Sequence, residues 1–108
     1  MPITSPLQRG RVYFADLGGG RKPWVVVSNN QRNRALEDAL VVRITTTDKY
    51  EGLASVQRLP ENECVVGLVR ADTLTTLYPD EVEEDAGGLS RVGMEAVEAA
   101  LRGALGLT

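Results

Sequence analysis

The chain contains no histidine and only one cysteine among its 108 residues. A single cysteine excludes an internal disulfide and is compatible with a reducing compartment, so we expect a cytoplasmic protein. Structural zinc sites are built mainly from cysteine and histidine. We therefore expect no metal site and no cofactor.

The chain also lacks any apolar run long enough to span a membrane, so we expect no membrane partner. Its first residues, Met1 to Gln8, are polar and contain proline, unlike a signal peptide. A chain of this length favours one domain, spanning residues 1–108, in which residues 1–8 form a flexible arm.

Charge is distributed unevenly along the chain. Residues 1–58 carry nine Lys and Arg against five Asp and Glu, a balance of +4, whereas residues 59–108 carry three against ten, a balance of −7. The basic half favours an anionic partner such as nucleic acid, and the acidic half argues against a protein that coats DNA. On charge alone, it is equally possible that the basic and acidic residues only keep two protein surfaces solvated and bind no partner.

Short apolar runs separated by turn residues predict a series of β-strands. The first two strands are joined through Gly18–Gly20 as a hairpin, and Pro23 favours an extended entry into the second. A helical turn is expected around Ala35–Asp38. The predicted strands are Arg11–Leu17, Trp24–Ser28, Leu40–Thr46, Leu53–Leu59, Cys64–Val69 and Asp72–Leu77.

One amphipathic helix is predicted near the C-terminus, over Arg91–Leu105. Ser90 suits its N-cap and Gly106 its end. The apolar stripe, at spacings of three and four, consists of Met94, Val97, Leu101 and Leu105. The predicted fold class is therefore mainly β with a C-terminal helix, arranged as a small β-barrel that the helix covers.

Polar residues gather at the ends of two predicted strands. Arg21 and Lys22 precede the second strand, and Thr45–Thr47 ends the third. If these strands are antiparallel neighbours, both groups lie at one edge of the sheet, where residues near loops build sites on a rigid frame. Along the third strand, Arg43 and Thr45 share one face.

Five segments, in this order, resemble the MazF/PemK toxins of bacterial toxin–antitoxin systems. The second is similar to the family's strand with a basic residue before proline, and the third to its strand that ends in a catalytic threonine. The segments are RGRVYFADL (9–17), GRKPWVVVSN (20–29), VVRITT (41–46), GLVRADTLTTL (67–77) and LSRVGMEAVEAALRGALGL (89–107).

This resemblance implies an SH3-like small β-barrel of the CcdB/MazF-like type that forms a homodimer. It implies a metal-independent, sequence-specific endoribonuclease that cuts single-stranded RNA, inhibits translation and arrests growth. It also implies a cognate antitoxin that blocks the RNA groove.

The resemblance assigns catalysis to Lys22, before the proline, and to Thr45, at the strand end. The family has arginine where this chain has Lys22, so Arg21 is the alternative cation, because only arginine offers two parallel hydrogen bonds to phosphate. Polar and cationic side chains nearby are expected to contact RNA bases and phosphates. They are Ser28, Asn29, Asn30, Arg43, Thr46 and Lys49.

Two other functions stay open at the level of sequence. A gyrase-poisoning toxin of the CcdB type has the same fold but acts through a C-terminal tryptophan, whereas this chain ends in Leu-Gly-Leu-Thr. A non-catalytic RNA-binding barrel also stays open, because Lys22 stands where the family has its catalytic arginine. The only tryptophan, Trp24, is expected in the core or a dimer interface. Thr73 and Thr75 replace a glutamine and a basic residue of the family, and the Gly18–Gly20 loop is short, so the cut sequence is not predicted.

Overall fold

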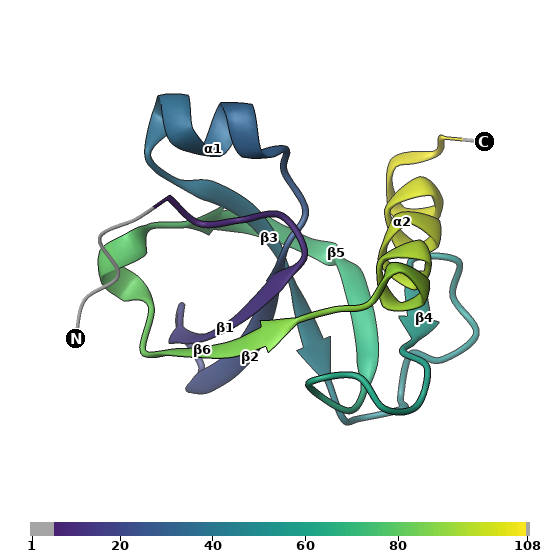
Figure 1. Cartoon of the computed structure of the whole chain (residues 1–108). Coiled ribbons are helices and arrows are strands. Elements are labelled where there is room, and N and C mark those ends of the chain that lie inside the picture. The colour runs from purple at the N-terminus through teal and green to yellow at the C-terminus, as the bar shows by residue number, and fades with distance from the viewer. Residues whose placement is uncertain (1–5, 108) are drawn as a thin grey trace.

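Six strands form one antiparallel sheet in the computed structural model, which describes residues 6–107 (Figure 1). They are β1 (Arg11–Asp16), β2 (Arg21–Val26), β3 (Ala39–Thr45), β4 (Val56–Arg58), β5 (Leu68–Leu77) and β6 (Glu84–Gly88). Their order across the sheet is β4-β5-β3-β2-β1-β6. The mainly β architecture is confirmed. β4 and β6 form the two edges of this sheet, and closure into an SH3-like barrel stays a prediction.

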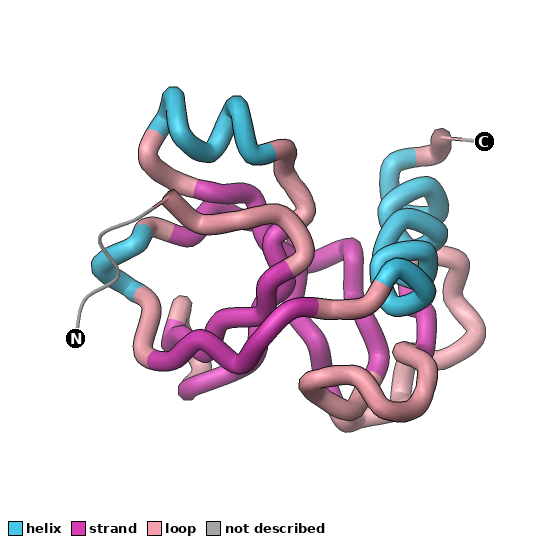
Figure 2. Tube along the Cα trace, in the orientation of Figure 1, coloured by secondary structure: helices cyan, strands magenta, loops and turns pink. Residues whose placement is uncertain are grey.

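The helices lie outside the framework of strands (Figure 2). They are α1 (Asn30–Leu36), a 3-10 turn (Pro79–Glu81) and α2 (Arg91–Leu105). The predicted C-terminal helix is confirmed with its bounds. Ser90 Oγ accepts a hydrogen bond from the Gly93 N–H at 3.1 Å, and Gly106 ends the helix with a φ of 70°. Within the described part of the chain, no helix is long and apolar enough to cross a membrane.

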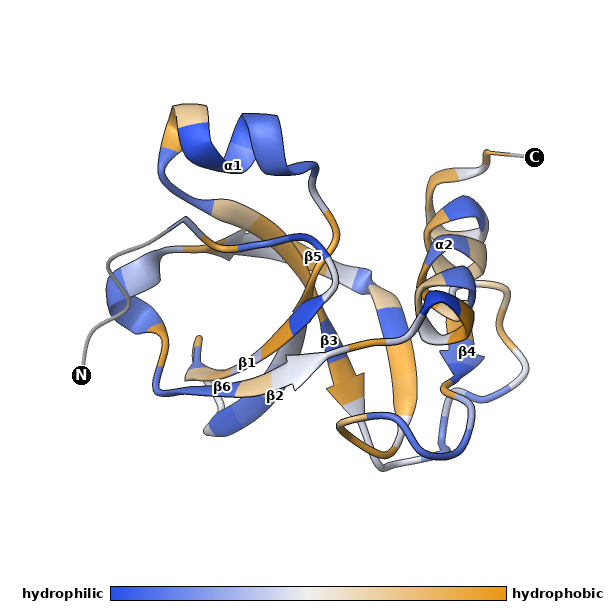
Figure 3. Ribbon diagram, viewed as in Figure 1, coloured by the Kyte–Doolittle hydropathy of each residue, from blue (hydrophilic) through white to orange (hydrophobic). Residues whose placement is uncertain are grey.

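Alternation along the strands sends apolar side chains to both faces of the sheet. On one face, Val25 and Val42 pack with Val97 and Ala100 of α2. On the other, Trp24 is buried as expected, and its Nε1–H donates to the Ala15 carbonyl at 3.3 Å. Figure 3 shows hydrophobic residues along β3 and β5, in the middle of the sheet.

The predicted flexible arm, residues 1–8, was wrong for its last residues. Residues 1–5 lie outside the described residues, but Leu7 is only 2% exposed and belongs to the same core cluster as Trp24. The Gln8 N–H also donates to Tyr13 Oη at 3.4 Å. From residue 7 onward the chain is therefore part of the packed domain.

The strand predictions after β3 were correct only in part, since Asp72–Leu77 is a strand throughout and the two predicted strands before it are not. Only Val56–Arg58 of the predicted Leu53–Leu59 is a strand, and the last two predicted strands are joined as β5. Cys64, the first residue of the predicted strand Cys64–Val69, is exposed, and Val66 is 82% exposed. Gly67, with a φ of 144°, turns this exposed loop into β5, and β5 then bulges between its residues opposite Val41 and Arg43.

Two elements had no clear signal in the sequence. β6 contains no strong β-former, yet its backbone pairs with β1, and Arg11 binds Asp85 at 3.0 Å across that pair. α1 replaces the predicted turn at Ala35–Asp38. It begins earlier because the Asn29 side chain caps it, accepting from the Arg32 N–H at 2.8 Å.

Candidate functional site

The start of β2 and the end of β3 lie at the same end of the sheet, as predicted. The two strands are antiparallel neighbours, with Trp24 opposite Arg43 and Val25 opposite Val42. Continued by two residues, this register places Lys22 opposite Thr45. The predicted cation and the predicted hydroxyl therefore come from adjacent strands.

Lys22, Trp24, Arg43 and Thr45 share one face of the sheet, because side chains alternate along each strand. Arg70 of β5 joins them, directly opposite Arg43. The three cations are partly exposed, whereas Thr45 is 7% exposed. We call the set of Lys22, Arg43, Thr45 and Arg70 the cationic face.

Arg21, the alternative cation, belongs to the opposite face. Its guanidinium stacks over the Phe14 ring, 4.7 Å from the ring centre, and it forms ion pairs with Glu83 at 3.4 Å and with Glu84. Two carboxylates therefore offset its charge. The structure places Lys22, and not Arg21, on the face that carries Thr45.

The hydroxyl of Thr45 is held by its own loop. Its Oγ1 accepts a hydrogen bond from the Thr47 N–H at 3.2 Å, which leaves the hydroxyl proton free to be donated outward. The backbone of Gly67 packs against the same residue, since a Cβ built on Gly67 would lie 2.4 Å from the Thr45 carbonyl oxygen. Thr46, the next predicted residue, is exposed.

Three side chains extend the site beyond the predicted residues. The Arg70 guanidinium lies 4.6 Å from the centre of the Tyr50 ring and binds Asp72 at 2.7 Å. Lys49 Nζ lies 5.4 Å from the same ring centre. These contacts attach the loop after β3 to the cationic face. In the sequence, Arg70 is a charged residue inside an otherwise apolar run. It could not be assigned to the site without knowing that β5 pairs with β3.

Arg43 lacks a compensating group. Among residues 6–107, no carboxylate lies within ion-pair distance of it, and its buried Nε has no hydrogen-bond partner. Its backbone N–H donates to Thr73 Oγ1 at 2.9 Å, and that hydroxyl donates to the Arg70 carbonyl at 2.6 Å. Thr73 therefore holds the bulge that sets Arg70 beside Arg43.

Ser28, Asn29 and Asn30 lie at the other end of β2, away from Lys22. Ser28 is buried, and its Oγ accepts from the Leu40 N–H at 2.9 Å. Asn29 caps α1, and Asn30 Oδ1 accepts from the Arg9 N–H at 2.7 Å. The structure thus divides the predicted RNA-binding residues into two groups, of which only Arg43, Thr46 and Lys49 adjoin Lys22 and Thr45.

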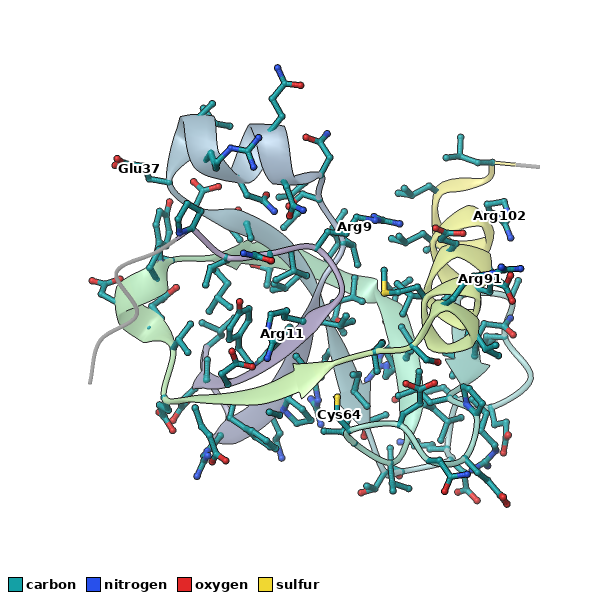
Figure 4. The ribbon with its side chains drawn as sticks, in the orientation of Figure 1. Arg9, Arg11, Glu37, Cys64, Arg91 and Arg102 are labelled. Atoms are coloured by element: carbon teal, nitrogen blue, oxygen red, sulfur yellow. The ribbon has the colours of Figure 1, made fainter. Side chains whose placement is uncertain are left out.

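Other arginines of the chain are neutralised or project away from this site. Arg9 binds Glu98 at 2.8 Å, and the hydrogen bonds that Arg11 donates to the Asp85 carboxylate raise the pKa of Arg11. Arg91 and Arg102 project from α2 on the side away from the sheet (Figure 4). Within residues 6–107, no three acidic or cysteine side chains gather in a way that could hold a metal ion.

Comparison with known proteins shows the family of the chain. The family model of the PemK-like, MazF-like toxins of type II toxin–antitoxin systems matches residues 8–105. The chain is 40% identical over 105 residues to "Endoribonuclease MazF1" of Mycobacterium bovis and "Endoribonuclease MazF4" of Mycobacterium tuberculosis, covering 97% of this chain and of each relative.

Solved structures give the same result. A mycobacterial "Endoribonuclease in complex with its cognate antitoxin" is 39% identical, with a TM-score of 0.86 over 94% of this chain and 97% of that chain. A MazE–MazF structure from Deinococcus radiodurans has a TM-score of 0.76 at 22% identity, over 96% of this chain and 99% of that chain, which shows the shared fold.

The antiparallel sheet and its C-terminal helix together have the MazF-like fold. The chain belongs to the family of PemK-like, MazF-like toxins of type II toxin–antitoxin systems.

Proposed function

We propose that this chain is an endoribonuclease toxin that cuts single-stranded RNA at specific sequences without a metal ion. Relatives that are 40% identical over nearly the whole chain bear the name endoribonuclease, which supports the activity. The observation that supports the site is the register of β2 and β3: continued by two residues beyond the pair Trp24 and Arg43, it puts Lys22 opposite Thr45 on one face.

The reaction is a transesterification. The 2′-oxygen of one nucleotide attacks the adjacent phosphorus, the bond from phosphorus to the 5′-oxygen breaks, and the products are a 2′,3′-cyclic phosphate and a 5′-hydroxyl. One proton leaves the 2′-hydroxyl and one is added to the departing 5′-oxygen. Negative charge builds on the non-bridging oxygens in between, and donors aimed at those oxygens lower the barrier.

Lys22 and Thr45 supply those donors. The Lys22 ammonium balances the charge of the pentavalent phosphate, and the Thr45 hydroxyl donates a hydrogen bond to one of its oxygens. Thr45 binds the phosphate rather than acting as a strong base. Arg43, Thr46 and Lys49 continue the contacts along the RNA strand, whereas at the far end of β2 Ser28 binds the Leu40 N–H, Asn29 caps α1 and Asn30 binds the Arg9 N–H.

The proposed assembly is a homodimer that a cognate antitoxin neutralises in the cytoplasm. The relative solved together with its antitoxin, which matches this chain at a TM-score of 0.86, supports the antitoxin, and the homodimer rests on the resemblance to the family. Light scattering on the purified chain tests the dimer, and a monomer at micromolar concentration would contradict it. Trp24 is 7% exposed, so the only tryptophan of the chain gives no support to a gyrase-poisoning role.

The activity test is cleavage of a long single-stranded RNA by the purified chain in excess EDTA, with both new ends mapped. We expect discrete cuts that leave a cyclic phosphate. Lys22→Gln and Thr45→Val should each lower kcat by about 10²–10³-fold, the usual effect of removing one donor at a developing charge. Arg21→Gln, with the same charge change one residue away, should retain most of the activity.

The opposite pattern is informative. Loss of cleavage in Arg21→Gln with full activity in Lys22→Gln would overturn the assignment of the cation. Absence of cleavage by folded protein that still binds RNA would favour the non-catalytic RNA-binding function.

A further inference from the structure

Arg43 and Arg70 occupy directly opposed positions on β3 and β5. Cβ atoms of such cross-strand partners lie about 5 Å apart, and like charges there destabilise a sheet. A bulge held by Thr73 follows this pair and adjusts the course of β5. The chain therefore maintains an arrangement that costs stability, which points to a ligand that offsets the repulsion.

The two arginines are differently constrained. Arg70 is fixed by Asp72 at 2.7 Å and by the Tyr50 ring at 4.6 Å, so its guanidinium has one defined position. Arg43 has no carboxylate partner among residues 6–107, and its Nε is buried without a hydrogen bond. One anchored guanidinium beside one uncompensated guanidinium is suited to bind a single anion between them.

We propose that Arg43 and Arg70 form a cross-strand clamp for one backbone phosphate of the RNA, next to the phosphate that is cut; the identity of this anion rests on the proposed function. Arg43 precedes Thr45 by two residues, about 7 Å along the strand. One RNA strand can therefore place the cleaved phosphate at Thr45 and a neighbouring phosphate at the clamp. The clamp fixes the position of the RNA, and Tyr50 and Asp72 orient Arg70.

Salt dependence of binding measures this contact directly. The probe is a fluorescent random-sequence RNA oligonucleotide with 2′-O-methyl groups, which lacks the attacking hydroxyl and cannot be cut. Each phosphate contact adds about 0.7 to the slope of log affinity against log salt for a single strand. Arg43→Gln and Arg70→Gln should each lower the slope by about 0.7 and weaken binding.

A double variant distinguishes a clamp from two separate contacts. Because both arginines hold one phosphate, the Arg43→Gln/Arg70→Gln variant should lose little more than either single variant. Arg43→Lys, which keeps the charge but not the paired hydrogen bonds, should retain the slope and lose part of the affinity. Arg91→Gln is the matched control, since its side chain is 92% exposed on α2, and its slope should equal that of the unchanged protein.

Stability separates the clamp from a structural role. Arg43→Gln removes a like-charge contact, so its melting temperature should equal or exceed that of the unchanged protein. A lower melting temperature with an unchanged salt slope would overturn the clamp, as would strictly additive losses in the double variant. If the unchanged protein cuts no RNA but the slopes behave as stated, the proposed function fails and the clamp stands.

Discussion

Gly67 determines how closely the loop before β5 approaches Thr45. Its φ of 144° disfavours any side chain, and a Cβ would lie 2.4 Å from the Thr45 carbonyl oxygen and 3.2 Å from Ile44 Cγ2. Backbone strain at Gly67 and overlap with its neighbours would both disturb Thr45, which the proposed mechanism requires in a fixed position. Nothing in the sequence around Gly67 distinguishes it from an ordinary turn glycine, because the close approach involves a strand more than twenty residues earlier.

Gly67→Ala should therefore lower the free energy of unfolding by about 2–4 kcal/mol, from backbone strain together with overpacking. Urea denaturation measures this loss. Gly52→Ala is the control, since Gly52 has a similar φ of 109° but no atom within 4 Å of its Cβ position, and it should lose only about 1 kcal/mol. Equal losses in the two variants would show that contact with Thr45 is unimportant.

At the scale of elements, α2 depends on a close contact with the segment before β4. A Cβ on Gly103 would lie 2.2 Å from the Ala54 carbonyl oxygen, so the helix backbone rests almost directly on that segment. Ser90 at the other end of α2 donates its N–H to Glu63 at 2.8 Å, which attaches the helix to the loop before β5. The helix is thus held at both ends by the two loops that flank β4.

Alanine in place of glycine usually stabilises a helix by about 1 kcal/mol. Here we expect the opposite: Gly103→Ala should destabilise the protein by about 1–3 kcal/mol, because the new methyl group overlaps the Ala54 carbonyl. Thermal denaturation followed by circular dichroism measures the change. Arg102→Ala, at the exposed neighbouring position, should be nearly neutral. A rise in stability for Gly103→Ala would mean that the loop moves aside at no cost.

Elements with their own local signals could be predicted from the sequence, and elements defined by their partners could not. α2 has a cap, an apolar stripe and a terminal glycine, and its bounds were predicted correctly. β6 and the loop at Cys64–Val66 were predicted wrongly for opposite reasons. The first is polar yet paired with β1, and the second is apolar, yet its Cys64 and Val66 are exposed.

At the scale of the whole molecule, the same distinction applies to the site. The site at the end of the sheet that carries Lys22 and Thr45 could be predicted, because neighbouring antiparallel strands bring the start of one beside the end of the other. Arg70 could not be assigned to it, since that requires knowing that β5 pairs with β3 and in which register. Ser28 to Asn30 follow the strand that begins with Arg21 and Lys22, and the length of that strand separates them from Lys22 in space.

The buried phenol of Tyr13 couples the stability of the whole domain to alkaline pH. Tyr13 is 3% exposed in the core cluster that contains Trp24, and this burial raises its pKa. The backbone hydrogen bond from Gln8 opposes that rise in the pKa only in part. The folded protein therefore keeps the phenol protonated at a pH where the unfolded chain releases the proton. Stability from this residue is fully present below the unfolded pKa of about 10 and is lost as pH rises through the folded pKa.

We therefore expect the free energy of unfolding to fall above about pH 10 by up to about 1.4 kcal/mol per pH unit from Tyr13 alone. Urea denaturation at a series of pH values should show this slope in the unchanged protein and a shallower one in Tyr13→Phe. Every other ionisable group is the same in the two proteins, so its effect cancels in the difference. Identical slopes would mean that the phenolate of Tyr13 reaches solvent without unfolding of the domain, and that the core cluster around Trp24 opens locally at high pH.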